Sequence, residues 1–238
     1  MDEIPYCGPA PTPEALWAAW NLAAFPLLLS ASPLLFALVR PDVRKGPAVL
    51  ASAALFVAFV SPLCALTVAL FAARGVHHLV LVLIAAPALA LAWPRVVPGA
   101  RVAGFLGLSL FLWLWHLPAA YDLAWGSSLF YWLMQAGLIG SAWAFWSHVF
   151  QGAGPWERVS GVGLILALAG QMGLIGAILS FAPRILYPHH LASAPAYGLD
   201  ALADQQLAGL VMWVPGMLPL ALLGVVLLRR GWREVAQA

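Results

Sequence analysis

The chain alternates between long apolar runs and short breaks that hold most of its charged residues. Seven apolar runs are separated in this way. Each approaches the roughly 20 residues that a helix needs to cross a bilayer core of about 30 Å. The pattern therefore predicts an all-α integral membrane bundle of seven transmembrane helices. The predicted helices cover residues 15–39, 47–63, 76–93, 102–120, 128–150, 159–181 and 206–228.

The composition agrees with a protein that lies in lipid. Of 238 residues, 63% are hydrophobic and 8% are charged, whereas a soluble domain carries roughly 25% charged residues. The net charge of +2 is too small and too scattered to indicate a nucleic-acid partner. No internal repeat or low-complexity linker divides the chain, so we expect a single membrane domain over residues 1–238.

The basic residues predict how the bundle is oriented. Seven crossings place nine Lys and Arg residues on one side and two on the other, and the basic side of a membrane protein faces the cytoplasm. We therefore expect a periplasmic N-terminal segment at 1–14 and a cytoplasmic tail at 229–238. The nine are Arg40, Arg44, Lys45, Arg95, Arg101, Arg158, Arg229, Arg230 and Arg233, and the two are Arg74 and Arg184.

Two features bear on how the helices pack. Gly170, Gly173 and Gly176 recur at helical spacing along one face of the sixth predicted helix. Small residues in such a row let a neighbouring helix approach closely. Cys7 and Cys64 fall on the same, outer side, where a disulfide is permitted, but the sequence does not fix their separation.

Histidines gather on the predicted outer side. Arg74-Gly75-Val76-His77-His78 stands at the threshold of the third helix, and His116 lies near the outer end of the fourth. The loop before the seventh helix adds two more histidines, and Asp204 opens that helix. Imidazole and carboxylate suit copper, zinc or iron. We therefore take His78, His116, Asp204 and His77 as candidate metal ligands.

Each candidate also has an ordinary structural interpretation. His77 and His78 can be solvated residues at the interface, and His116 can bond a backbone carbonyl at a helix end. Asp204 can cap its own helix by accepting bonds from free backbone N–H groups. Arg74 can bind an anionic lipid head or pair with Asp204 or Asp122.

Several blocks of sequence over about residues 61–216 form a recognisable set. The most specific block opens with Asp204-Gln205-Gln206 and ends with Val214-Pro215-Gly216. The others are Ser61-Pro62-Leu63, the stretch 78–87, Trp115-His116-Leu117-Pro118-Ala119-Ala120-Tyr121-Asp122 and Leu186-Tyr187-Pro188. Together these blocks resemble the CtaG family of bacterial cytochrome c oxidase assembly proteins.

The resemblance implies a multi-pass protein of the bacterial inner membrane that helps to mature a haem–copper oxidase. Its partners would be oxidase subunits or other assembly factors, and copper is the implied metal. By motif, His78, His116 and Asp204 are the positions carried over. The chain departs from the family pattern at Arg74 and at Tyr131, Met134 and Gln135, where the family commonly has histidines or an acid. His77 is a possible substitute, although adjacent helical residues point about 100° apart.

Four functions are compatible with these residues. The first is an oxidase assembly factor, without enzyme activity, that handles copper at its periplasmic face. A purely structural membrane subunit would use every histidine for packing. A transporter for a metal or small solute would need polar groups within the helices, for which Gln135 and Gln171 are the main candidates. A membrane enzyme would depend on His116, Asp122 and Asp204.

Overall fold

The computed structural model describes residues 5–94, 96, 101–151 and 154–235, and these residues form helices and loops without a strand. Arg95 and the acids Asp2 and Glu3 lie outside the described residues, as does the side chain of Glu234. The main helices are α1 (Ala24–Val39), α2 (Lys45–Phe59), α3 (Pro62–Ala69), α4 (Phe71–Val80), α5 (Ala86–Ala92), α6 (Arg101–Trp115), α7 (Pro118–Gly126), α8 (Ser128–Phe150), α9 (Pro155–Phe181) and α10 (Ala201–Val235). Shorter turns are η1 (Leu16–Ala18), the π-helical η2 (Leu81–Ala85), η3 (Pro188–His190) and η4 (Ala194–Tyr197).

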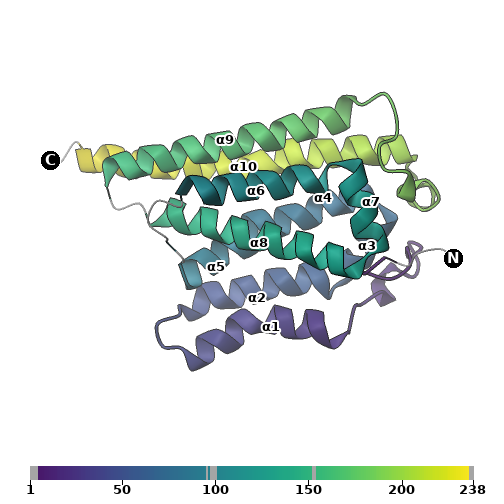
Figure 1. Ribbon diagram of the computed structural model, residues 1–238, viewed down its shortest axis with the longest axis horizontal. Coiled ribbons are helices and arrows are strands. Elements are labelled where there is room, and N and C mark those ends of the chain that lie inside the picture. Colours follow the sequence, from purple (N-terminus) through teal and green to yellow (C-terminus); the bar gives the residue numbers. More distant parts are fainter. Residues whose placement is uncertain (1–4, 95, 97–100, 152–153, 236–238) are drawn as a thin grey trace.

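The long helices lie side by side along one direction (Figure 1). The N-terminal segment, α3, α7 and the α9–α10 connection gather at one end of the bundle, on the right of Figure 1, whereas α10 ends at the opposite side. We call the right-hand end the loop end and define it by residues 5–23, 60–71, 116–127 and 182–200.

Each predicted apolar run contains a helix, but some bounds differ. The first run was predicted as a helix over 15–39, yet α1 begins only at Ala24, and the second was predicted over 47–63, yet α2 ends at Phe59. The chain bends by 42° between α2 and α3 and by 78° between α6 and α7, and neither bend nor the separate helix α3 was predicted. Both bends precede a proline, Pro62 or Pro118, which disfavours the α conformation in the residue before it. Ser61 and Leu117 are accordingly extended, with ψ of 169° and 117°.

Within the described residues, three helices are long and apolar enough to cross a membrane, and up to five spans exist if each bent pair counts as one. The three cover residues 71–92, 156–181 and 201–233. Helix α1 has 16 residues, and α8 carries Gln135, Ser141 and His148 among its 23. The chain is thus a helical membrane protein, while seven crossings and the orientation stay predictions.

The span over residues 71–92 contains the π-helical turn η2, which Trp146 stabilises. Pro87 has no N–H, so it cannot donate to the carbonyl of Val82 five residues before it, as the π-helical pattern requires. The indole Nε1 of Trp146 on α8 donates to that oxygen instead, at 2.7 Å. Both groups are buried, so this bond satisfies a carbonyl that the proline leaves free.

Helices α9 and α10 pack closely through glycine. A Cβ atom on Gly176 would lie 2.8 Å from the backbone oxygen of Gly209, and one on Gly173 would lie 2.8 Å from Met217 Cε. The predicted close approach is therefore confirmed at Gly173 and Gly176. It is wrong at Gly170, where a Cβ would meet nothing within 4 Å.

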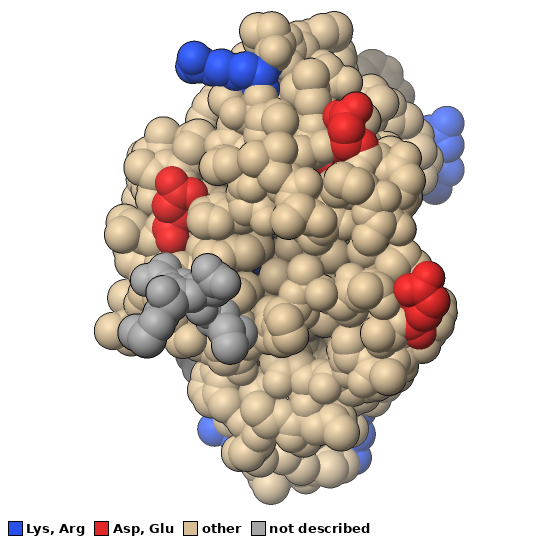
Figure 2. Space-filling view, turned by 90° about the vertical axis from the view of Figure 1, so that its right-hand side faces the viewer, with Lys and Arg blue, Asp and Glu red and all other residues tan. Residues whose placement is uncertain are grey.

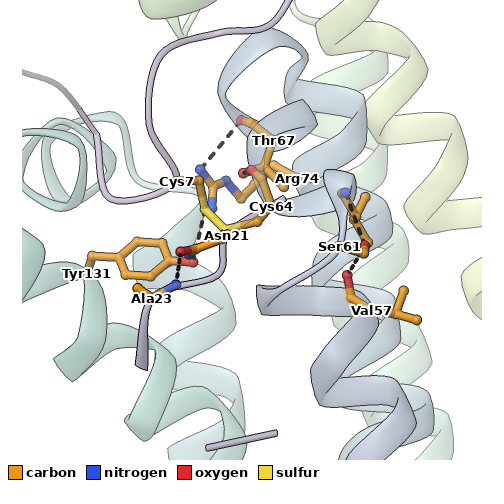
Figure 3. Close-up of a disulfide and its surroundings, with 10 residues drawn as sticks. Cys7, Asn21, Ala23, Val57, Ser61, Cys64, Thr67, Arg74 and Tyr131 are labelled. Carbon is orange, nitrogen blue, oxygen red and sulfur yellow. Dashed lines mark hydrogen bonds between the residues drawn. A yellow bond between two sulfur atoms is a disulfide. The ribbon is translucent and has the colours of Figure 1, made fainter. Parts of the chain in front are cut away.

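A disulfide joins Cys7 to Cys64 and ties the N-terminal segment to α3 (Figure 3). The pairing that the sequence left open therefore exists in the structure. It places Tyr6 against Tyr131 of α8, with ring centroids 5.0 Å apart.

Candidate functional site

Polar side chains are buried near the loop end of an otherwise apolar bundle. Helix α4 contributes Arg74, His77 and His78, which are 4%, 0% and 2% exposed. Helix α10 contributes Asp204 and Gln205, which are 0% and 1% exposed. Buried polar groups are costly unless they find partners, so the partners of each one define what this region can do.

Asp204 caps α4 rather than its own helix. Its Oδ2 accepts a hydrogen bond from Phe71 N at 2.6 Å, and its Oδ1 accepts one from Ala72 N at 2.9 Å. Leu70 is extended between α3 and α4, so the first N–H groups of α4 have no helical partner. The expected cap of α10 is wrong for Asp204, because Asp200 takes that role by accepting from Ala203 N at 2.7 Å.

Gln205 fixes the segment that follows α9. Its Oε1 accepts from Leu186 N at 2.7 Å, and its Nε2 donates to the oxygens of Arg184, at 3.3 Å, and Leu179, at 3.5 Å. The neighbouring residues 204 and 205 thus connect the start of α10 with α4 on one side and with the α9–α10 connection on the other.

His77 and His78 are deeper than expected. Helix α4 begins at Phe71, so His78 lies about 10 Å along the helix from its start at 1.5 Å per residue. The interpretation as solvated interfacial residues is therefore wrong. None of their four ring nitrogens has a hydrogen-bond partner. His78 lies 5.7 Å from His116 and 5.8 Å from His77 between ring centroids.

His116 stands at the bend between α6 and α7. Its Nδ1 donates to Leu112 O at 2.7 Å, which leaves Nε2 as the nitrogen with a free lone pair. Tyr187 Oη donates to the backbone oxygen of His116 at 2.7 Å and holds the bend in place. The orientation of this imidazole is thus fixed by groups that leave one nitrogen available.

The candidate ligands do not all converge. His78 is close to His116 and to His77, whereas both carboxylate oxygens of Asp204 are engaged by α4. The described part of the chain holds no group of three or more His, Cys, Asp or Glu side chains that could bind a metal ion. A metal at His78, His116, Asp204 or His77 therefore stays a prediction.

Arg74 is buried among aromatic rings, which the sequence did not indicate. Its guanidinium carbon lies 5.5 Å from the ring centroid of Trp115 and 5.8 Å from those of Tyr121 and Tyr131. The expected pairing with an acid is wrong, because Asp204 caps α4 and Asp122 pairs with His189 at 2.9 Å. The sequence held one indication that Arg74 has no acidic partner on its own helix, because no acid lies three or four residues from it.

His190 is also buried, although adjacent histidines in a loop suggested solvation. Its Nε2 is 2.9 Å from Tyr121 Oη, and it is 1% exposed. Burial first, and then the positive charge of Arg74, lowers the pKa of His190 to about 3. His190 is therefore a neutral structural residue at neutral pH.

The comparisons with known proteins identify the class to which this helical membrane protein belongs. A family profile described as cytochrome c oxidase caa3 assembly factor (Caa3_CtaG) matches residues 37–234. The chain belongs to this family. The match covers α2 to α10 almost entirely, and it confirms the resemblance noted in the sequence. The search of curated proteins and that of solved structures each found no match.

Membership carries a coarse functional statement. The family implies an assembly factor for cytochrome c oxidase, located in a membrane and interacting with oxidase components. It also suggests a non-catalytic role. The metal, the partner subunits and the face of the membrane at which the protein acts belong to the proposal below.

Proposed function

We propose that this protein assembles a cytochrome c oxidase by holding a copper ion between His78 and His116 at the periplasmic face and passing it to an oxidase component. Copper is here a cargo, bound and released without a catalytic step. The observation that carries the proposal is the pair of imidazoles 5.7 Å apart between centroids, with both nitrogens of His78 unpartnered.

The donor set fits copper. Neutral imidazole is a suitable ligand for copper, and a buried nitrogen without a partner costs about 1–3 kcal/mol, which a bound ion would offset. The bond from His116 Nδ1 to Leu112 O resembles the outer-shell contacts that orient metal-binding histidines. Asp204 does not fit as a ligand, because both its oxygens serve α4.

The small number of ligands suits a carrier. Structural metal sites are usually closed by four protein ligands, whereas an open position lets a ligand exchange. His78 and His116 provide two, and His77 is close enough to contribute a third after rearrangement. An ion held by so few groups can be released to a stronger oxidase site.

The charge pattern supports the orientation. The acids exposed at the loop end are Glu14, Asp122 and Asp200. Figure 2 shows acidic side chains standing apart from one another on a mostly uncharged face. The basic residues Arg40, Arg44 and Lys45 lie at the α1–α2 connection and Arg229 and Arg230 near the end of α10, on the other side, whereas the loop end has the exposed Arg184. Since basic residues stay in the cytoplasm, the loop end would face the periplasm.

Deletion and complementation test this function. A strain without the gene should contain oxidase with reduced copper and activity, and the intact gene should restore both. His78→Ala and His116→Ala genes should fail to restore them, whereas His189→Ala, a histidine of the same end outside the pair, should succeed. Normal copper and activity in the deletion strain would overturn the proposal.

A metal-free assembly role is the second candidate, and Arg74 favours it. Arg74 lies four residues before His78, on the same side of α4, and its charge opposes a cation there. In this case the protein would act only by binding oxidase components. His78→Ala and His116→Ala genes would then restore oxidase copper as well as the intact gene does.

A further inference from the structure

We propose that Arg74 is the centre of an anion site that takes one chloride ion, in a small cavity beneath the Cys7–Cys64 disulfide. The site adjoins the proposed copper pair, since Trp115 lines the cavity and its ring centroid is 4.9 Å from that of His78, but an anion site goes beyond the proposed function. It is lined by Tyr6, Cys7, Trp115, Tyr121 and Tyr131 as well as by Arg74. Figure 3 shows the guanidinium beside the disulfide, with Tyr131 nearby.

Arg74 carries a buried charge that no acidic side chain of the described residues compensates. Arg74 is 4% exposed, and among the described residues it forms no ion pair. A buried ion without a counter-charge strongly destabilises the folded protein, and arginine cannot avoid this cost by deprotonation, because its pKa is too high. The rings of Trp115, Tyr121 and Tyr131 provide part of the compensation through cation–π contacts. They do not neutralise the charge.

The cavity has more hydrogen-bond donors than acceptors around it. Nε and Nη1 of Arg74 have no hydrogen-bond partner with the geometry of a full bond, and Nη2 reaches Thr67 O at 3.5 Å. The hydroxyls of Tyr121 and Tyr131 lie near the guanidinium. Trp115, on the same cavity, has a buried indole N–H without a partner. An occupant that accepts several hydrogen bonds and carries negative charge satisfies all of these groups at once.

The small size of the cavity limits which anion can occupy it. The cavity has a volume of about 10 Å³ for the centre of a water-sized sphere, which is at the lower limit for one water molecule, so a chloride ion enters with a small outward movement of the lining side chains. Phosphate, sulfate and other polyatomic anions are too large for this space. The charge of Arg74 favours a monatomic anion over a water molecule, and chloride is the most abundant such anion in biological solutions.

Chloride dependence of stability tests the site. The full-length protein in detergent is heated at constant ionic strength while chloride replaces gluconate. The unfolding temperature should rise with chloride and then saturate, because a ligand that binds only the folded state stabilises it. Bromide should act as chloride does, and sulfate should have no effect. An unfolding temperature that is the same in chloride and gluconate would overturn the proposal.

Variants place the effect at Arg74. Arg74→Gln should abolish the chloride dependence, whereas Arg184→Gln, an exposed arginine of the same end, should leave it unchanged. Trp115→Phe keeps the ring but removes the N–H donor, so it should raise the chloride dissociation constant about tenfold. This variant decides the question if Arg74→Gln fails to fold. Three results would count against the site. They are an unchanged chloride dissociation constant in Trp115→Phe, a chloride dependence that Arg74→Gln retains, and a chloride dependence that Arg184→Gln loses.

A crystal grown in bromide gives an independent readout. An anomalous peak should lie within hydrogen-bond distance of Arg74 Nε or Nη1, and no peak there would overturn the proposal. The same thermal unfolding series on an Asp2→Asn, Glu3→Gln double variant tests whether a carboxylate of this chain occupies the anion site instead of chloride. Chloride dependence found only in the double variant would contradict the chloride site.

Discussion

Asp204 shows how one side chain can hold two distant parts of the chain together. It sits in the first turn of α10, yet its carboxylate binds the first N–H groups of α4, 132 and 133 residues away. The positive end of the α4 dipole also favours its charge. This contact fixes the helix that carries His77 and His78, so Asp204 is a positioning residue for the proposed copper pair.

Replacing Asp204 should therefore destabilise the protein. Asp204→Ala leaves two buried N–H groups without partners, at a cost of about 1–3 kcal/mol each. The free energy of unfolding in detergent should fall by several kcal/mol. Asp200→Ala removes an exposed cap and should cost no more than about 1 kcal/mol. Equal effects of the two changes would show that the α4 cap has no special weight.

His190 predicts a pH dependence at the same scale. Its folded pKa of about 3 lies below the ordinary value of 6.5. Between these pH values the unfolded chain binds a proton that the folded chain does not, so stability falls as the pH is lowered below about 6.5. His190 contributes at most about 1.4 kcal/mol per pH unit to this loss.

The unfolding temperature between pH 7 and pH 5 measures the effect. His190→Gln should make the decline shallower than in the wild type. The groups that face His190 are Tyr121, Arg74, His189, Phe71 and Trp125. An unchanged slope in His190→Gln would contradict the buried, neutral state of this residue.

At the scale of elements, the apolar runs located the helices because hydrophobic patterning acts locally. The bends at Pro62 and Pro118 and the late start of α1 at Ala24 were not predicted. What the sequence could not predict depends on contacts between elements. Asp204 could serve α10 or another helix, and only the extended Leu70 before α4 decides between them. The burial of Arg74 and His190 likewise depends on where α7, α8 and η3 lie.

The α9–α10 contact gives a prediction with a matched control. Gly176→Ala places a methyl group against the Gly209 backbone, which cannot move aside cheaply, so it should lower the free energy of unfolding by about 1–3 kcal/mol. Gly170→Ala lies on the same helix in open space and should be neutral or slightly stabilising. Thermal unfolding of the two variants in one detergent makes the comparison.

At the scale of the whole molecule, the loop end concentrates the features that are unusual for a membrane bundle. The disulfide, the Arg74 cavity and the His78–His116 pair lie around one region where α3, α4, α6 and α7 meet. The disulfide closes this region by holding the N-terminal segment against α8. The sequence placed both cysteines and most histidines on one side, but their pairing depends on the folded chain.

Binding of copper by His78 and His116 is the central proposal, and the number of copper ions bound per chain tests it most directly. Purified protein is loaded with copper under reducing conditions that leave the disulfide intact, freed of unbound metal and analysed for copper per chain. We predict about one copper per chain in the wild type and in His189→Ala, and a loss of most copper in His78→Ala and in His116→Ala. Substoichiometric copper in the wild type, or full loading of both variants, would contradict the account.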